Sequence, residues 1–577
     1  METSEFEQEE NTLSSDDGEL IPCDVVQGYE EDLPSDTQRD STLKDAEYDL
    51  GNDMEIVLIA VAGDEDALEF ASERLRNDSA FVLQAVEKNG EALRWVSEDL
   101  RSNMEIVMAA VTSNGLALEY ASHELQNDLA IVMKAVENDG YALGFASPEL
   151  QNDEGVVMKA IEDSVDALYW ASDALKNNPM VITKAVTNNG MALKYASPEL
   201  QNDIDIVIQA VKKDGRALIF ASDTLRNDKG VVITAVENDG LALIYASRGL
   251  RSDREVVMKA VENNGHALEF ASTELQNDLA VVMKAVESDG SALEFASKEL
   301  RSDKAVVMKA VEKDGYALRF ASNELQNDEE VVRKAIENSA GALEYASEEL
   351  RGNREIVMMA VRENGYILKY ASPALQNDRE VVMMAVENFG YALKYASQEL
   401  QNDREVVMKA VENDGFVLCW VQEKFRKDEE VVMKAVKNNG MALQGASDEL
   451  KNNKKIVMMA VENDGHALEF ASHKLQNNKK IVMIAVENYK DALVYASHKL
   501  QNDYDVVVKA VSKNGSILRF ASHTLRGNRK IVIQAVTNDG LALRFASDEL
   551  RKDRGVVLIA VANNGKALKY ASNTERY

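Results

Sequence analysis

Apolar residues recur along the chain with a helical spacing that repeats every 25 residues. In the first unit Ile56, Val57, Ala60 and Val61 lie on one face of a predicted helix, because they follow the spacing i, i+1, i+4, i+5. A second apolar group, Ala67–Phe70, returns without insertion or deletion as far as residues 567–570, which makes 21 units. Positions are numbered below by the first unit, so that position 60 denotes Ala60 and its equivalents at steps of 25 residues.

Each unit is predicted to hold two short helices. Position 53 is Asp in 15 units and Asn in 6, and such a side chain before a helix accepts hydrogen bonds from its first turn. Position 65 is Gly in 17 units and is predicted to end the first helix as a left-handed C-cap. Position 72 is Ser in 20 units, which predicts a new N-cap that interrupts the second helix. The units without the glycine have Glu65, Val165, Ala340 and Lys490.

Three positions are predicted to form the core between stacked units. Position 60 is Ala in all 21 units, which lets neighbouring helices approach closely, and position 70 is aromatic in 20 units. Position 58 is Met in 12 units and either fills the core, which its place beside the apolar positions 57 and 61 favours, or forms an adaptable apolar groove. Because two short helices cannot bury such faces alone, the units must stack. A leucine-rich horseshoe is disfavoured, because its L-x-x-L-x-L strand motif is absent.

The predicted fold class is all-α: an α-solenoid of 21 tandem 25-residue two-helix units in residues 51–577, preceded by a disordered acidic tail in residues 1–50. The tail holds 17 acidic and 2 basic side chains and shows no periodicity. At about 8–10 Å per helix layer, the array follows a path on the order of 200 Å.

Three stretches depart from the pattern. Arg333 and Ala340 change positions 58 and 65 of the same unit, which predicts a local irregularity near residues 328–345. Residues 415–445 contain Cys419-Trp420-Val421-Gln422 and Gly445 in place of the usual core residues, so they favour either a bend or docking site, or neutral drift. The last unit lacks the Leu found at 550, and we expect an open end that frays or pairs with another molecule.

The repeated string resembles a known family. The sequence ALEYAS-x-EL-x-ND-x-E-V-V-M-x-AV, seen at residues 117–136, 267–286 and 392–411, is similar to the tandem repeat called domain of unknown function 4116. The resemblance covers the array, and the family's unit spans two of the 25-residue units, so the odd count leaves one unpaired. It implies a helical repeat and intracellular use, and it brings no catalytic residues.

Charge and composition disfavour several classes of partner and location. The chain has a formal charge of −35 and a pI near 4.7, which opposes binding to phosphate backbones. No apolar run reaches the roughly 18 residues of a membrane helix, and the N-terminus has no signal-peptide pattern. Two distant cysteines form no disulfide framework. We therefore expect a cytoplasmic, reducing location and no membrane association.

Two rows of side chains are candidate partner-binding sites. Position 59 is Lys in 10 units, among them Lys259, Lys284, Lys309 and Lys334 in a row, which either track an acidic surface or flank the core as solvated side chains. Positions 66 and 69 are the most variable, as expected for contacts on a constant scaffold, and the aromatic members of position 66 include Tyr141, Tyr316, Tyr366, Tyr391 and Phe416. His473, His498 and His523 share one position but lie too far apart to hold one metal.

The sequence predicts a non-enzymatic protein-binding scaffold that uses the extended surface of the array. No nucleophile with a base, phosphate loop, dinucleotide fingerprint or metal-ligand cluster is present, so we expect no catalytic residues, cofactor or metal. Two alternatives stay open: an array that binds nucleic acid through the lysine row, and a structural spacer that associates with its own copies.

Overall fold

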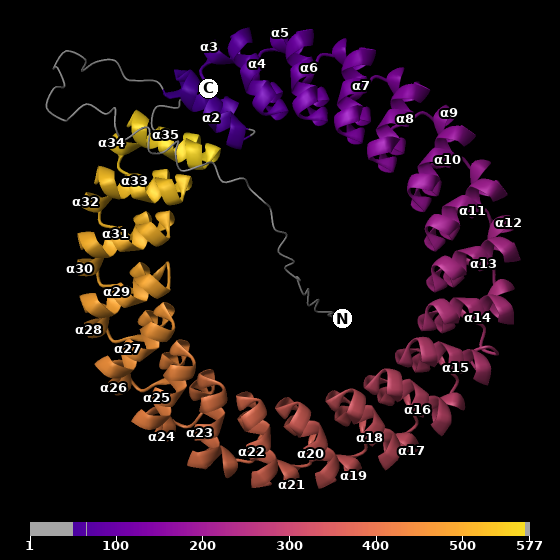
Figure 1. Ribbon diagram of the computed structural model, residues 1–577, viewed down its shortest axis with the longest axis vertical. Helices are drawn as coiled ribbons and strands as arrows, with labels where there is room; N and C mark the ends of the chain where they lie inside the picture. The colour runs from indigo at the N-terminus through magenta and orange to yellow at the C-terminus, as the bar shows by residue number, and fades with distance from the viewer. Residues whose placement is uncertain (1–49, 65, 572–577) are drawn as a thin grey trace, which may run out of the picture. The chain divides into compact units, whose positions relative to one another are not determined.

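The computed structural model describes residues 50–64 and 66–571, which lie in the unit Asp49–Tyr577 (Figure 1). These residues form helices and connecting turns without any strand, so the predicted all-α class is confirmed. None of the described helices is both long enough and apolar enough to serve as a membrane span. The predicted disordered tail falls outside the described residues, apart from Leu50 at its end.

Each unit begins with an α-helix of ten residues. The 21 ten-residue helices are α2 (Met54–Gly63), α4 (Ser79–Lys88), α6 (Met104–Ser113), α7 (Leu129–Asn138), α8 (Glu154–Asp163), α10 (Pro179–Asn188), α11 (Ile204–Lys213), α13 (Lys229–Asn238), α14 (Arg254–Asn263), α15 (Leu279–Ser288), α16 (Lys304–Lys313), α18 (Glu329–Asn338), α20 (Arg354–Glu363), α22 (Arg379–Asn388), α23 (Arg404–Asn413), α25 (Glu429–Asn438), α27 (Lys454–Asn463), α29 (Lys479–Asn488), α31 (Tyr504–Lys513), α33 (Arg529–Asn538) and α35 (Arg554–Asn563).

The second helix predicted for each unit is present and is a 3₁₀ helix. Seventeen of them run six residues from position 65 to position 70, as in η3 (Gly90–Trp95), η4 (Gly115–Tyr120), η6 (Gly140–Phe145) and η18 (Ala340–Tyr345) through to η28 (Gly565–Tyr570). The shorter ones are η2 (Ala67–Phe70), η8 (Val165–Tyr169), η22 (Gly415–Cys419) and η25 (Ala492–Tyr495). A 3₁₀ helix is tighter than an α-helix and is used in short pieces, which suits a six-residue segment.

A last short turn leads to the next unit and confirms the break predicted at position 72. It is a four-residue α-helix in 13 units: α3 (Glu73–Arg76), α5 (Glu98–Arg101), α9 (Asp173–Lys176), α12 (Asp223–Arg226), α17 (Asn323–Gln326), α19 (Glu348–Arg351), α21 (Pro373–Gln376), α24 (Glu423–Arg426), α26 (Asp448–Lys451), α28 (His473–Gln476), α30 (His498–Gln501), α32 (His523–Arg526) and α34 (Asp548–Arg551). Figure 1 shows these helices along the outer circumference, with the ten-residue helices closer to the centre.

The predicted N-caps at position 53 are confirmed in all 21 units. Asp128, for example, accepts hydrogen bonds from the backbone N–H groups of Ala130 at 2.9 Å and Ile131 at 3.0 Å. Because the first turn of a helix has no internal partners for these groups, each cap fixes where its ten-residue helix begins. The buried face then carries positions 56, 57, 60 and 61, as the spacing predicted.

The role predicted for the glycine at position 65 is wrong. None of the described glycines has the positive φ of a left-handed cap, and the helix ends in extended backbone at position 64, as at Asp139 with φ −149° and ψ 116°. The glycine instead starts the 3₁₀ helix against the next unit. A Cβ built at Gly140 would lie 2.5 Å from the carbonyl oxygen of Ala160, so only glycine lets the two backbones come this close.

Units that lack this glycine support that interpretation. Where Val165 or Ala340 replaces it, the flanking ten-residue helices (α8 with α10, and α18 with α20) pack less closely than other neighbours inside the array. The irregularity predicted near residues 328–345 is therefore present as a looser contact. Around Lys490 the 3₁₀ helix starts two residues late, at Ala492.

Polar side chains also join successive units. Asn138 accepts a hydrogen bond from the N–H of Gly115 at 2.7 Å and donates one to the carbonyl of Thr112 at 3.1 Å. Ion pairs also join the units: the first residue of many ten-residue helices, position 54, is basic and pairs with two acids of the next unit. Arg404 contacts Asp428 at 3.1 Å and Glu430 at 2.6 Å. These contacts fix the register between units.

The same contacts close the array into a ring. Arg554, in the last ten-residue helix, pairs with Asp53 at 2.7 Å and Glu55 at 2.5 Å, which occupy the places that the acids of a twenty-second unit would take. Helix α2 packs against α35 and η28, and a Cβ on Gly565 would overlap the carbonyl oxygen of Ala60. Unit 21 therefore meets unit 1 as each unit meets its neighbour (Figure 1).

Ring closure corrects the prediction of an open C-terminal end. The described part of the last unit, as far as Ala571, is covered by the first unit and needs neither a separate capping helix nor another molecule. Twenty-one equal steps around a circle turn by about 17° each, which is the small rotation per repeat typical of solenoids.

The close approach at position 65 gives a stability prediction. We expect Gly140→Ala to destabilise the array by about 1–3 kcal/mol, because the added methyl group overlaps a backbone carbonyl that cannot rotate away. The control is Gly249→Ala, where the nearest atom is 3.9 Å away and the backbone is already helical, with φ −63°. Thermal unfolding followed by circular dichroism should show a lower midpoint for the first variant only. Equal midpoints would contradict the proposed role of the glycine.

Candidate functional site

The solvent-facing side of the ten-residue helices carries a row of apolar residues, here called the Met stripe and defined as position 58. It is apolar in 19 of 21 units, with Thr183 and Arg333 as exceptions, and every member is half-buried. The core-filling role predicted for these methionines is thus only half right. They pack against the edge of the core with one side and meet solvent with the other.

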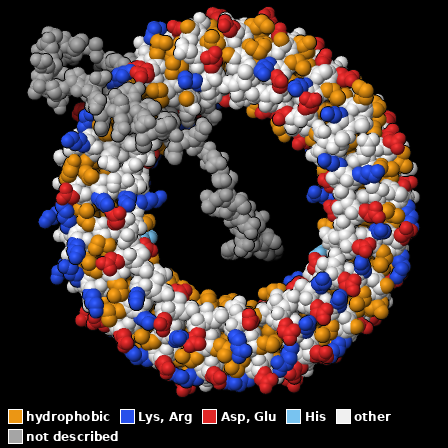
Figure 2. All heavy atoms as spheres, viewed as in Figure 1, with side chains coloured by type: hydrophobic (Ala, Val, Ile, Leu, Met, Phe, Trp, Pro, Cys, Tyr) orange, Lys and Arg blue, Asp and Glu red, His pale blue; other side chains and the backbone are white. Residues whose placement is uncertain are grey.

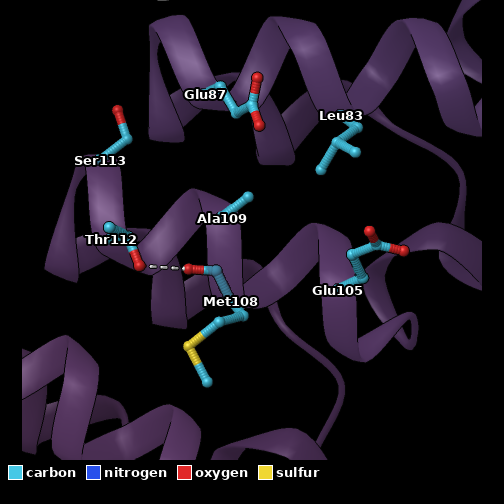
Figure 3. Close-up of a pocket in the computed structure, with 7 residues that line it drawn as sticks. All are labelled: Leu83, Glu87, Glu105, Met108, Ala109, Thr112 and Ser113. Atoms are coloured by element: carbon cyan, nitrogen blue, oxygen red, sulfur yellow. Dashed lines mark hydrogen bonds between the residues drawn. The ribbon is translucent and has the colours of Figure 1, made fainter.

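A groove between two neighbouring helices lies on this stripe. Figure 3 shows this groove, where Leu83 of α4 and Ala109 of α6 point toward each other and Met108 lies beside them. Glu87, Glu105, Thr112 and Ser113 complete the lining, and the Thr112 hydroxyl donates a hydrogen bond to the carbonyl of Met108 at 2.7 Å. The groove is shallow and open, so it suits contact with another surface better than enclosure of a small molecule.

The lysine row at position 59 is mostly neutralised by glutamates at position 62. Lys259 pairs with Glu237 at 3.2 Å and Lys284 with Glu262 at 3.1 Å, both across neighbouring helices. Lys334 pairs with Glu337 at 3.3 Å within one helix. Lys309 makes no ion pair with any described residue. The row therefore offers less free positive charge than its spacing in the sequence predicts.

The aromatic residues predicted at position 66 lie second in the 3₁₀ helices and contact position 70 of the next unit. Tyr141 meets Trp170 edge-on with ring centroids 5.6 Å apart, and Tyr316 meets Tyr345 at 6.3 Å. These rings bridge neighbouring units while keeping one side in solvent, since Tyr141 and Tyr316 are both 43% exposed. Phe416 faces no such ring, because Gly445 occupies position 70 of the next unit.

The rings of three successive units form one larger aromatic cluster. Tyr366 contacts Tyr395 at 5.5 Å and Phe389 at 6.1 Å, and Tyr391 contacts Trp420 at 6.5 Å. Tyr366 and Tyr391 were predicted as contact residues from the sequence, but Phe389 was not. Its signal is visible there, because Phe389 replaces the usual Asp or Asn of position 64.

Burial and neighbouring hydrogen-bonding groups shift the pKa values of two tyrosines in this cluster. Burial and a hydrogen bond with Glu344 raise the pKa of Tyr370 to about 12. Hydrogen bonds from Tyr395 and Lys369 lower the pKa of Tyr366. The Tyr370 phenol therefore stays protonated at neutral pH and adds no negative charge to the aromatic surface.

No group of three or more His, Cys, Asp or Glu side chains within the described ranges is arranged to hold a metal ion. His473, His498 and His523 each begin a different short helix and are exposed. The nearest polar partner of the His473 ring is Gln476, at 3.0 Å.

Comparison with known proteins identifies the repeat. The profile of the family described as Domain of unknown function (DUF4116) matches 11 segments between residues 53 and 575, most of them about two units long. The chain belongs to this family. Two of its matches, 103–151 and 128–176, overlap by one unit, as expected when a two-unit family repeat meets an odd number of units. A search of the curated proteins found no match.

The least regular pair of units in this DUF4116 array lies at residues 415–445. The side chain of Trp420 is 66% exposed. Cys419 is half-buried, and a Cβ on Gly445 would lie 2.9 Å from its backbone nitrogen. Burial raises the pKa of the Cys419 thiol, so less of it is thiolate at neutral pH.

We therefore expect Cys419 to react slowly with iodoacetamide at pH 7.5, more slowly than free cysteine under the same conditions. The measurement is the alkylation rate of a Cys23→Ser variant, in which Cys419 is the remaining cysteine, followed by mass spectrometry. A urea-unfolded sample of the same variant provides the control and should react at the rate of free cysteine. A rate in the folded protein above that of free cysteine would show an activated thiol and contradict the prediction.

Proposed function

We propose that this ring is a non-enzymatic protein-binding scaffold whose Met stripe contacts the partner. The proposal also places it in a cytoplasmic, reducing compartment, on the basis of its two widely separated cysteines. The supporting observation is the stripe itself: 19 half-buried apolar side chains in equivalent places around a closed array.

The chemistry of the stripe favours a protein partner. Methionine is flexible and polarisable, so it adapts to irregular apolar surfaces and is common at binding surfaces with several partners. Contiguous exposed apolar surface on a folded protein marks an interaction site. Twenty-one neighbouring helices at about 8–10 Å spacing make a circle roughly 55–65 Å across, which offers the stripe a long path for such contacts.

The groove on the Met stripe gives no support to an enzymatic role. In the groove of Figure 3 the Thr112 hydroxyl is bonded to a backbone carbonyl and is not paired with a base. Glu87 and Glu105 come from different helices and line an open surface from which water is not excluded. We therefore propose no catalytic residue and no cofactor for this chain.

The two alternative functions receive less support. A nucleic-acid-binding array needs free lysines, but Lys259, Lys284 and Lys334 are already paired with glutamates. An extended spacer that grows by stacking copies end to end needs an open face on a terminal unit, whereas α2 and α35 cover each other.

Site-specific cross-linking tests the proposal. A photo-reactive phenylalanine analogue replaces Met383 on the stripe of α22, or Ala374 on α21 as the matched control, because Ala374 is exposed and nine residues away. After irradiation in native lysate, the variant at 383 should give one or a few discrete protein adducts and the variant at 374 should not. Equal adducts from both variants, nucleic acid adducts alone, or adducts only with the chain's own copies would contradict the proposal.

A further inference from the structure

One sector of the ring reverses the charge of the rest. Residues 446–571, here called the basic sector, carry 20 Lys and Arg against 13 Asp and Glu, a net charge of +7. Residues 51–445 carry 41 basic and 68 acidic side chains, a net charge of −27. Figure 2 shows Lys and Arg side chains gathered along the left arc, over α28–α33.

The reversal is concentrated at the second residue of the ten-residue helices, position 55. Ten units have Asp or Glu there, and the only basic residues at this position are Lys455, Lys480 and Lys530. All three side chains are exposed. In the same three units the N-cap is Asn453, Asn478 or Asn528 in place of the more common Asp.

These units therefore lack both the acidic N-cap and the acid at position 55. Elsewhere in the ring, these two acids pair with a basic residue at position 54 of the preceding unit. At seven places within the described residues a basic residue at position 54 pairs with an acidic cap and with a second acid at position 55 of the next unit, as Arg354 meets Asp378 and Glu380. At the corresponding place Lys454 faces Asn478 and Lys480. Lys454, Lys455, Lys480 and Lys530 form no ion pair within the described residues.

The stability of the ten-residue helices does not explain why these three units have Lys at position 55. The N-terminus of a helix carries partial positive charge, so a cation in the first turn is unfavourable there. An acid at position 55, Glu in eight other units and Asp in two, is the better choice for the fold. We propose that the row Lys455, Lys480 and Lys530 is a docking surface for an extended acidic polypeptide.

The spacing fits this occupant. Neighbouring ten-residue helices lie about 8–10 Å apart, so the three steps from Lys455 to Lys530 span roughly 24–30 Å. An extended peptide rises about 3.3 Å per residue, so nine residues with an acid at every third position match the row. The one acid within the row, Asp505, is already paired with Lys479 at 2.7 Å and does not repel the peptide as a free charge would.

A peptide fits this surface better than a nucleic acid does. A nucleic acid extending beyond the sector would meet the remaining ring, with its net charge of −27, whereas a short acidic peptide ends within the sector. The inference rests on the proposed scaffold function in that the partner is a protein. The docking surface adjoins the Met stripe, since Glu105 at position 55 lines the groove beside Met108, but it uses different side chains that can be changed separately.

Fluorescence anisotropy of the full chain tests the inference. The probe is a labelled ten-residue peptide with Glu at every third position, compared with the same peptide carrying Gln there and with a ten-nucleotide single-stranded DNA. The variant Lys455→Glu, Lys480→Glu, Lys530→Glu installs the residue that other units already have, so we expect it to fold as the parent does. A second variant with Ala at the three sites follows units such as those of Ala80 and Ala130.

The control variant Lys212→Glu, Arg248→Glu, Lys298→Glu makes the same charge change on exposed residues outside the sector. We expect the Glu peptide to bind, the Gln peptide not to bind, and the reversal at 455, 480 and 530 to weaken binding at least about tenfold, with the control within about twofold. The Ala variant should fall between them.

Equal weakening by both triple reversals would overturn the inference, because it would show that only net charge matters. Tighter binding of the DNA than of the peptide, lost in the sector variant, would overturn it in favour of a nucleic-acid surface. If peptide binding fails while the Met383 cross-links persist, only this inference fails. If the cross-links fail while sector-dependent peptide binding persists, the contact assigned to the Met stripe is wrong and the docking surface stands.

Discussion

The close contact between the glycine of one unit and the alanine carbonyl of the next sets the geometry of the whole ring. Gly140 meets Ala160, and Gly565 meets Ala60 in the same way. Because this contact has no side chain to adapt, it makes each step between units nearly the same. Equal rotations between successive units bend the array into a regular curve. When these rotations sum to a full turn, the last unit meets the first. The looser helix pairs beside Val165 and Ala340 show what happens locally when the contact is relaxed.

Electrostatic contacts follow this backbone geometry and do not create it. The Lys304 ammonium beside Asp328 holds the pKa of that carboxyl below its usual value, and similar pairs recur around the ring at exposed sites. Such pairs stabilise a fold weakly, and their main effect is to fix which residue faces which. In the basic sector Lys479, Arg529 and Arg554 keep such pairs, whereas Lys454 faces Asn478 and Lys480 in place of acids. We assign both the lysines of this sector and the apolar side chains of the Met stripe to contacts with other molecules, as proposed above.

Much of the fold could be predicted from the sequence because its causes are local. The Asx caps at position 53 and the serine break at position 72 act within a few residues. The glycine at position 65 was misinterpreted, since its sequence context fits a left-handed cap equally well and its actual neighbour, the alanine carbonyl, lies twenty residues further on. Ring closure could not be predicted, because an error of about 1° per step accumulates to about 20° over the array. At the candidate site, the rows at positions 58, 59 and 66 were visible in the sequence. Most of the glutamates that pair with the lysines, and the rings of Trp170 and Tyr395 that contact Tyr141 and Tyr366, come from neighbouring units.

Closure of the array is the central claim, and a distance measurement between its first and last helices tests it most directly. In a Cys23→Ser, Cys419→Ser background, spin labels at Ala62→Cys and Ala562→Cys report on α2 and α35, both at exposed positions. Labels at Thr537→Cys and Ala562→Cys report on α33 and α35, one step apart inside the array, and serve as the reference. A closed ring predicts that electron paramagnetic resonance gives the same short distance for both pairs. A long, broad distance for the 62–562 pair beside a short reference distance would show an open array and contradict the account.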